Sequence, residues 1–338
     1  MFDQISRRTF LSSTVAVAAG GIALPEAVRA ASAAPLFSPA KEANVTAADQ
    51  IPIVDTHQHL WDLTKFRLPW AKGNAVLDRS FVTADYLEAS EGQNVVKTVY
   101  MEVDVDPSQQ VAEAEYVMEL CRQKGNPMVG AVISGRPANA EFRDYILKYK
   151  GNEHIKGVRQ VLHGDETPAG YCLDQQFVKS VQLLGELGMC FDLCMRDGEL
   201  MDGDKLVAQC PGTRFVVDHC GNFSVQETDA KKRKVWEDGM KALAQRPNVV
   251  CKISGIIATA KPDWKPADLR PNLQFAMETF GPNRRMFAGD WPVCTLTASF
   301  AQWVGALKEV VQSMGMSAGD QKKLFHDNAV KFYELKDK

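Results

Sequence analysis

The segment Val54-Asp55-Thr56-His57-Gln58-His59 decides how the rest of the sequence is interpreted, because it closes the first of eight strand-like runs. Alternate residues of a strand point to the same side, so His57 and His59 share one side, the interior of a closed sheet if Asp55 also faces inward. Neutral imidazole binds metals and titrates near neutrality. A His-x-His pair at a strand end therefore favours a metal or proton-transfer site over a structural role.

Short β-branched runs alternate with longer helical patterns from Ile51 onward, which is the rhythm of repeated βα units. The predicted strands are Ile51 to Thr56, Val95 to Val103, Met128 to Ser134, Ile155 to Leu162, Met189 to Met195, Arg214 to His219, Val249 to Ser254 and Met286 to Asp290. The predicted helices are Ser108 to Lys124, Ala138 to Lys150, Asp174 to Leu187, Gly203 to Cys210, Asp229 to Arg246 and Leu269 to Phe280, with further helices after Thr297. Eight such units over about 290 residues match the α/β class and the (β/α)8 TIM barrel. A doubly wound open sheet is the alternative, and the absence of a GxGxxG motif after the first strand removes one reason to prefer it.

The last strand ends in Phe287-Ala288-Gly289-Asp290-Trp291-Pro292, which places a carboxylate at its carboxyl end. In a closed barrel the eighth strand pairs with the first, so we expect Asp290 to lie beside His57 and His59. An aspartate near imidazoles or a cation stays ionised and can accept a proton from water as a general base, or bind a metal with them. The alternative is an aspartate that only caps a proline-containing turn.

Other polar side chains are expected at the same rim. His219 ends the sixth strand and could polarise a substrate carbonyl or bind a metal. Arg159 and Arg196 close the fourth and fifth strands, where their forked donors could bind a carboxylate or a sugar oxygen of the substrate. Glu102, near the end of the second strand, could be a further metal ligand or base. For the arginines and for Glu102, an ion pair at the rim is the alternative.

Two loop residues are further candidates for substrate contact. His163 follows the fourth strand, and Trp61 begins an aromatic segment that continues through Phe66 and Trp70. A long aromatic loop over a barrel mouth is typical of a lid or a pocket wall. Simple packing over the rim is the alternative for this segment.

The first thirty residues predict an export signal. Ser6-Arg7-Arg8-Thr9-Phe10-Leu11 precedes an apolar run from Val15 to Leu24, and Val28-Arg29-Ala30 offers a small-residue cleavage site. This pattern resembles a twin-arginine signal, which implies the twin-arginine export machinery and a periplasmic or secreted protein. The apolar run is shorter than the roughly 18 residues that span a bilayer, so no stable membrane anchor is expected. Residues 31–49 read as a linker, and the barrel is expected to occupy 50–338.

The composition narrows the possible partners. A formal net charge of -3 and a pI near 6.1 provide no basic surface for nucleic acid, so we expect a small-molecule substrate. The eight cysteines form no CxxC pair and several lie in strand-like runs, which predicts buried free thiols rather than disulfides. A homo-oligomer remains open.

Four motifs together resemble the amidohydrolase-related family of the amidohydrolase superfamily: Val-Asp-Thr-His-Gln-His-Leu-Trp at 54–61, Gly-Val-Arg-Gln at 157–160, Val-Val-Asp-His-Cys-Gly at 216–221 and Gly-Asp-Trp-Pro-Val at 289–293. The sequence is most similar to the branch of sugar-lactone and other lactone hydrolases, over nearly everything after the linker. The resemblance implies a (β/α)8 barrel and hydrolysis of a lactone of a sugar acid or a dicarboxylic acid. A decarboxylase of the same superfamily is the runner-up. A catalytically inactive periplasmic binding protein is a third possibility, although a pure binder needs no positioned base.

The resemblance also implies roles for individual residues. His57 and His59 match the first-strand pair, His219 the later histidine, and Asp290 the acid that activates water. Many metal-dependent relatives have a histidine at the end of the fifth strand, where this chain has Asp-Leu-Cys-Met-Arg at 192–196, and two-metal members have a modified lysine where this chain has Arg159. These departures argue against two metals. One divalent ion, zinc first, and a metal-independent site both stay open.

Overall fold

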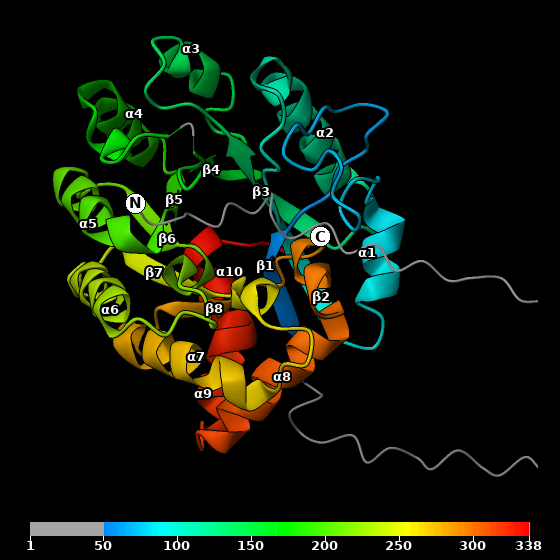
Figure 1. The fold of residues 1–338 in the computed structure, drawn as a ribbon. Coiled ribbons are helices and arrows are strands. Elements are labelled where there is room, and N and C mark those ends of the chain that lie inside the picture. The colour runs from blue at the N-terminus through cyan, green and yellow to red at the C-terminus, as the bar shows by residue number, and fades with distance from the viewer. Residues whose placement is uncertain (1–50, 166, 338) are drawn as a thin grey trace, which may run out of the picture. The chain divides into compact units, whose positions relative to one another are not determined.

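The computed structural model describes residues 51–165 and 167–337, so the predicted signal (1–30) and linker (31–49) lie outside the described residues. Eight parallel strands pair in sequence order, and Figure 1 shows helices surrounding them. The strands are β1 (Ile53–Gln58), β2 (Val95–Met101), β3 (Met128–Ser134), β4 (Ile155–Val161), β5 (Cys190–Cys194), β6 (Arg214–Val217), β7 (Val249–Ile253) and β8 (Arg285–Phe287). The predicted (β/α)8 barrel is confirmed.

The predicted helices are confirmed with shifted ends. They are α2 (Gln110–Arg122), α3 (Phe142–Leu147), α4 (Gln175–Glu186), α5 (Leu200–Gln209), α6 (Ala230–Gln245) and α7 (Pro266–Phe280), followed by α8 (Phe300–Ser313), α9 (Ala318–Lys322) and α10 (Asn328–Tyr333). The short α1 (Thr83–Ala89) was not predicted. Its seven residues give a helical period too few turns to stand out from the long loop before it.

The last strand closes on the first through backbone hydrogen bonds beyond the end of β8. The amide of Asp290 donates to the carbonyl of His57 (2.9 Å), and the amide of His59 donates to the carbonyl of Trp291 (2.8 Å). The Thr56 hydroxyl donates to the carbonyl of Phe287 (2.7 Å). The barrel is therefore closed at the carboxyl ends of its strands, where function is found in this fold.

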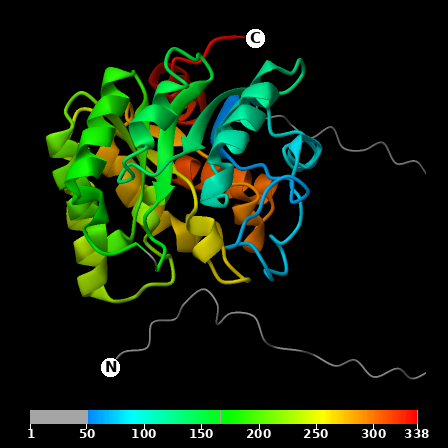
Figure 2. The same ribbon diagram turned by 90° about the horizontal axis from the view of Figure 1, so that it is seen from above.

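The opposite end of the barrel interior is apolar and is covered by α10. Figure 2 shows this helix, in red, at one end of the barrel, and the long loop after β1, in blue, toward the other end. Ala329 and Tyr333 of α10 pack in one buried cluster with strand residues that include Val54, Val99 and Met286. Because α10 covers this end, a site can open only at the other end, among the loops that follow the carboxyl ends of the strands.

Asp55 does not face the barrel interior, which corrects one premise of the sequence argument. Its Oδ2 accepts a hydrogen bond from Tyr86 of α1 (2.8 Å), so it points to the helix layer. The pairing of β1 with β2 shifts register between Asp55 and Gln58, and a register shift breaks the simple alternation of sides. His57 reaches the interior because of this irregularity.

All eight cysteines are buried and free, as predicted. None of the helices in the described part of the chain has the length and apolar character needed to cross a membrane.

Candidate active site

The chemistry-bearing side chains lie at or just beyond the carboxyl ends of β1, β6 and β8. Asp290 lies three residues beyond β8 in a left-handed conformation (φ 53°), and His219 lies two residues beyond β6 at φ 52°. Gly289 is required before Asp290, because a Cβ there would lie 2.5 Å from the Asp55 carboxylate and 2.5 Å from the Phe300 ring. The close approach of β1 and β8 therefore sets the position of Asp290.

Asp290 meets three imidazoles, as the closure of the barrel predicted. Its Oδ1 lies 3.4 Å from Nε2 of His59, 3.7 Å from Nε2 of His57 and 3.9 Å from Nε2 of His219. The ring centroids of His57 and His219 are 4.4 Å apart, and those of His57 and His59 are 4.7 Å apart. The predicted proximity of these four residues is confirmed, whereas their catalytic roles stay predictions.

The hydrogen bonds of His59 and His219 limit where their protons lie. His59 Nδ1 lies 2.9 Å from the carbonyl oxygen of Met101, which can only accept, so Nδ1 carries a hydrogen. In neutral His59 the lone pair of Nε2 then faces the Asp290 carboxylate. His219 Nδ1 lies 3.0 Å from the Ser254 hydroxyl, which can donate to it or accept from it.

Because His59 Nε2 and the Asp290 carboxylate are both hydrogen-bond acceptors, a proton or a cation is needed between them. The side chains at this position fit one divalent metal ion. His57, His59 and Asp290 each offer a ligand atom within 4.8 Å of the others, and all three are buried. Neutral imidazole and carboxylate are ligands of zinc and similar ions. A second group, of His57, Asp218 and His219, satisfies the same distance, but the ammonium of Lys252 lies 3.3 Å from the Asp218 carboxylate. The geometry therefore fits one ion rather than two.

Glu102 lies outside this group because Arg159 holds it. Arg159 Nε donates to Glu102 Oε1 (2.6 Å), Nη2 donates to the Glu102 carbonyl (2.7 Å), and Glu102 Oε2 accepts from the amide of Asp104 (2.7 Å). Arg159 Nη1 also lies 3.2 Å from His57 Nε2. The structure thus brings Arg159 to the centre of the site and gives Glu102 the ion-pair role that was its alternative.

Two further predicted substrate contacts, Arg196 and Trp61, donate hydrogen bonds to loop carbonyls. The Arg196 guanidinium donates to the carbonyls of Gly164 and Thr167 and pairs with Glu199, so it organises the loop after β4. Trp61 has no exposed surface, and its Nε1 donates to the Arg79 carbonyl (2.6 Å). Trp61 therefore packs beneath its loop, which corrects its prediction as a residue exposed to substrate.

His163 lies in the loop after β4, as predicted, and is half-buried there, whereas its contact with substrate stays a prediction. The structure does not include it among the side chains around Asp290 that could hold a metal.

Sequence reasoning missed three buried charged residues close to the histidines. They are Asp192 of β5, Asp218 just after β6, and Lys252 of β7. None has any exposed surface. Lys252 Nζ lies 2.5 Å from Asp192 Oδ2 and 3.3 Å from Asp218 Oδ1, and Asp218 Oδ1 lies 3.5 Å from His57 Nδ1. A lysine inside the otherwise apolar run Val249–Ile253 is the signal that could have found them, because a buried lysine requires a partner.

Burial and neighbouring charges shift the pKa values of the cluster. Burial lowers the pKa of His57 well below 6.5, against the attraction of Asp218, and burial also lowers the pKa of His219. Burial alone would raise the pKa of Asp290, but His219, His59 and Arg159 outweigh it and the net pKa lies below 3.8. The arrangement therefore holds neutral His57 and His219 beside an ionised Asp290.

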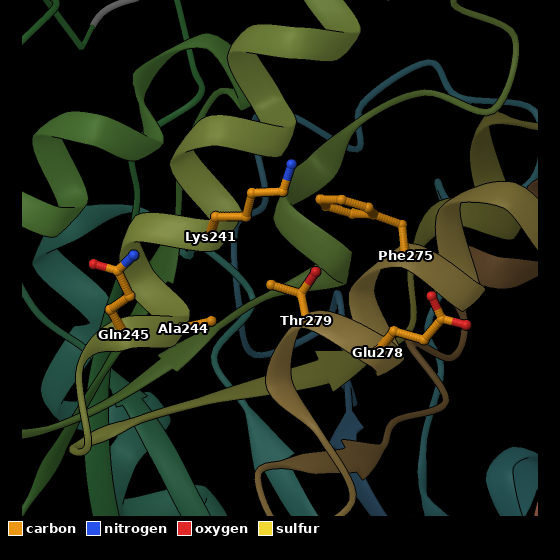
Figure 3. Close-up of a pocket in the computed structure, with 6 residues that line it drawn as sticks. All are labelled: Lys241, Ala244, Gln245, Phe275, Glu278 and Thr279. Atoms are coloured by element: carbon orange, nitrogen blue, oxygen red, sulfur yellow. The ribbon is translucent and has the colours of Figure 1, made fainter.

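A surface hollow lies on the outside of the barrel between α6 and α7. Its lining residues, shown in Figure 3, are Lys241, Ala244, Gln245, Phe275, Glu278 and Thr279. Lys241 Nζ lies 5.4 Å from the centre of the Phe275 ring. The residues of this hollow do not belong to the strand-end cluster, so the cluster is the candidate active site.

Comparison with known proteins shows which family and which solved structures the chain resembles. A sequence profile of the amidohydrolase family matches residues 54–335. The L-fucono-1,5-lactonase of Burkholderia multivorans is 26% identical over 293 residues, which cover 83% of this chain and 96% of that protein. The L-rhamnono-gamma-lactonase of Scheffersomyces stipitis is 25% identical over 338 residues, with 84% and 98% covered. A crystal structure of a Burkholderia multivorans amidohydrolase with bound zinc matches with a TM-score of 0.75 at 24% identity, and covers 84% of this chain and 100% of that one.

Proposed function

Because the chain belongs to the amidohydrolase family of enzymes, we propose that it is a hydrolase that opens the ring of a lactone with water. The observation that carries the proposal is the position of Asp290, whose Oδ1 lies 3.4 to 3.9 Å from the Nε2 atoms of three histidines at the barrel mouth. Two relatives that this chain covers almost completely are lactonases, which supports the same substrate class.

In the proposed reaction, Asp290 accepts a proton from a water molecule, and the water oxygen attacks the lactone carbonyl carbon. The Ser254 hydroxyl can donate to Nδ1 of His219, which leaves an Nε2–H that can donate to the developing oxyanion. The bond between the carbonyl carbon and the ring oxygen then breaks. The proton held by Asp290 passes to the ring oxygen, and the product is a hydroxy acid.

His57, His59 and Asp290 are the residues that would hold a metal ion. One divalent ion there would polarise the substrate carbonyl and lower the pKa of water. The bound zinc of the Burkholderia amidohydrolase supports zinc as the first candidate. Metal analysis of the purified protein is expected to find up to one equivalent of divalent metal per chain, and two equivalents would contradict the one-ion geometry.

The charge of the rim favours a neutral sugar lactone over a dicarboxylic one. Three arginines lie at or just beyond the carboxyl ends of β3, β4 and β5, and each is paired with a carboxylate: Arg136 with Asp104 (2.7 Å), Arg159 with Glu102 (2.6 Å) and Arg196 with Glu199 (3.0 Å). A substrate with two carboxylates would have to compete with these carboxylates for the guanidinium groups.

The test measures acid release and carbon dioxide separately. Neutral 1,4- and 1,5-aldonolactones and a dicarboxylic lactone are incubated with the enzyme in a pH-stat, and aromatic carboxylic acids are incubated with a trap for carbon dioxide. We expect one acid group per neutral lactone and no carbon dioxide. Carbon dioxide release would show a decarboxylase, and binding of lactones without turnover would show a binding protein.

Export by the twin-arginine route is part of the proposal. Eight buried free cysteines fit a protein that folds in a reducing compartment before it is exported. We expect the full-length chain to reach the periplasm and the Arg7→Lys/Arg8→Lys variant to remain in the cytoplasm. Cell fractionation followed by immunoblotting checks this, and equal periplasmic amounts of both proteins would contradict it.

A further inference from the structure

Lys252 is a buried charge to which the proposed reaction gives no role. Its side chain has no exposed surface, and its ammonium contacts the carboxylates of Asp192 in β5 (2.5 Å) and of Asp218 just after β6 (3.3 Å). A well-packed apolar pair is often as stable as a buried ion pair, so stability alone is a weak reason for this arrangement. The position of the ion pair relative to the active site gives a better one.

Asp218 connects Lys252 to the imidazole of His57. Asp218 Oδ1 lies 3.3 Å from Lys252 Nζ and 3.5 Å from His57 Nδ1, and Asp218 Oδ2 lies 3.5 Å from Arg159 Nη1. Lys252 and Arg159 therefore each lie beside a different oxygen of one carboxylate. The carboxylate is fixed with Oδ1 against the Nδ1 edge of the ring.

Arg159 independently indicates which nitrogen of His57 carries the hydrogen. Its Nη1 lies 3.2 Å from His57 Nε2, and a guanidinium can only donate, so Nε2 accepts. The hydrogen is then on Nδ1, which faces Asp218. The two edges of the ring give the same answer, and His57 Nε2, which faces Arg159, also lies 3.7 Å from Asp290 Oδ1.

We propose that Lys252 is a positioning residue, which acts through Asp218 to hold the His57 ring with its hydrogen on Nδ1 and its Nε2 lone pair at the barrel mouth. Lys252 has no exposed surface, and Asp192 pairs with its ammonium (2.5 Å) and balances its charge. Without the ammonium, only Arg159 orients Asp218, and the Nδ1 edge of His57 loses its fixed partner. The effect on turnover rests on the proposed function, whereas the effect on the ring does not.

The decisive measurement is nitrogen-15 NMR of histidine-labelled protein without substrate. The signals of His57 are assigned by their loss in His57→Gln. In the wild type we expect a protonated Nδ1 and an unprotonated Nε2. A proton on Nε2 in the wild type would overturn the proposal without any variant of Lys252.

The variant that removes the ion pair is Lys252→Met/Asp192→Asn, which keeps similar side-chain sizes and the same net charge. We expect its His57 signals to show a mixture of both tautomers, and unchanged signals would overturn the proposal. Asp192→Asn alone keeps Lys252 beside Asp218, so its His57 signals should match the wild type. A change in that single variant would show that Asp218 is not the link.

Turnover supplies the second readout. In the Lys252→Met/Asp192→Asn variant kcat should fall about 10- to 100-fold while KM changes little, as for other residues that orient catalytic groups. The matched control is Arg246→Met/Asp204→Asn, which removes an ion pair of 2.7 Å between Arg246, directly after α6, and Asp204 of α5 in the outer layer. Equal kcat values in the two double variants would contradict the positioning role. If the wild type opens no lactone, the proposed function fails, and the NMR result still decides the role of Lys252.

Discussion

The two halves of the barrel interior differ sharply in composition although the same strands build both. The apolar half, closed by α10, contains Val54, Val99, Val132, Val216, Met286 and Tyr333. The polar half, beneath the mouth, contains His57, Arg159, Asp192, Asp218, Lys252 and Asp290, and each of these is at most 4% exposed. Burial of valines makes the free energy of folding more favourable, whereas burial of charged groups makes it less favourable. The contrast indicates that one half stabilises the fold and that the other is selected for chemistry.

The largest effect expected from this contrast is on turnover in the polar half. Asp290→Asn removes the proposed base with little change in size, so kcat/KM on the best lactone should fall about 10²- to 10⁴-fold. Thermal unfolding should change little, because the carboxylate contributes reactivity rather than packing. The control is Asp263→Asn at an exposed position. Activity within a few fold of the wild type would exclude Asp290 as the base.

A change in the apolar half should have the opposite outcome. Met286 is 1% exposed, and Met286→Ala leaves a cavity that should lower the free energy of unfolding by about 2–5 kcal/mol. The kcat of the folded protein should stay within about twofold of the wild type, because the apolar cluster that contains Met286 includes neither Asp290 nor any histidine.

Urea unfolding and initial rates at low temperature check this pair of expectations. Met201→Ala, at a residue that is 42% exposed, is the matched control and should be close to neutral in both assays. A large loss of kcat in folded Met286→Ala would show that the two halves are not separable.

The sequence predicted the apolar half better than the polar half, and particular residues show why. Strand-like runs and their spacing predicted the barrel, and closure predicted that Asp290 would meet His57 and His59. Lys252 was missed because its partners come from two other strands, and alternation along one strand carries no information about neighbours that are distant in sequence. The buried state of Trp61 could not be predicted for a similar reason, since it depends on how the loop folds back on Phe81.

Tyr86→Phe should have a smaller effect and shows how the helix layer supports the polar half. Its hydroxyl donates to Asp55 Oδ2 (2.8 Å), and Asp55 Oδ1 accepts the amides of Gly289 (2.7 Å) and His57 (3.0 Å). Removal of the donor leaves a buried carboxylate less satisfied, which should cost about 1–3 kcal/mol of folding stability. Urea unfolding measures this cost. Tyr116→Phe, at a half-buried tyrosine of α2, is the control. An equal loss of unfolding free energy in both variants would show that the hydrogen bond from Tyr86 to Asp55 has no particular importance.

The smallest expected effect is the absence of a pH transition, and it follows from burial in the polar half. His57 and His219 act in their neutral forms, and burial places the pKa of each below 6.5. As the pH falls through 6.5, an ordinary histidine gains a proton, whereas these two stay neutral and lose that form only at lower pH. Asp290 stays ionised over the same interval, because its pKa lies below 3.8. The kcat/KM for a neutral lactone should therefore change less than about twofold between about pH 8 and about pH 6.5. A loss of activity centred at or above pH 6.5 would mean that water reaches these rings freely, and the contrast between the two halves would then be one of residue type only and not of environment.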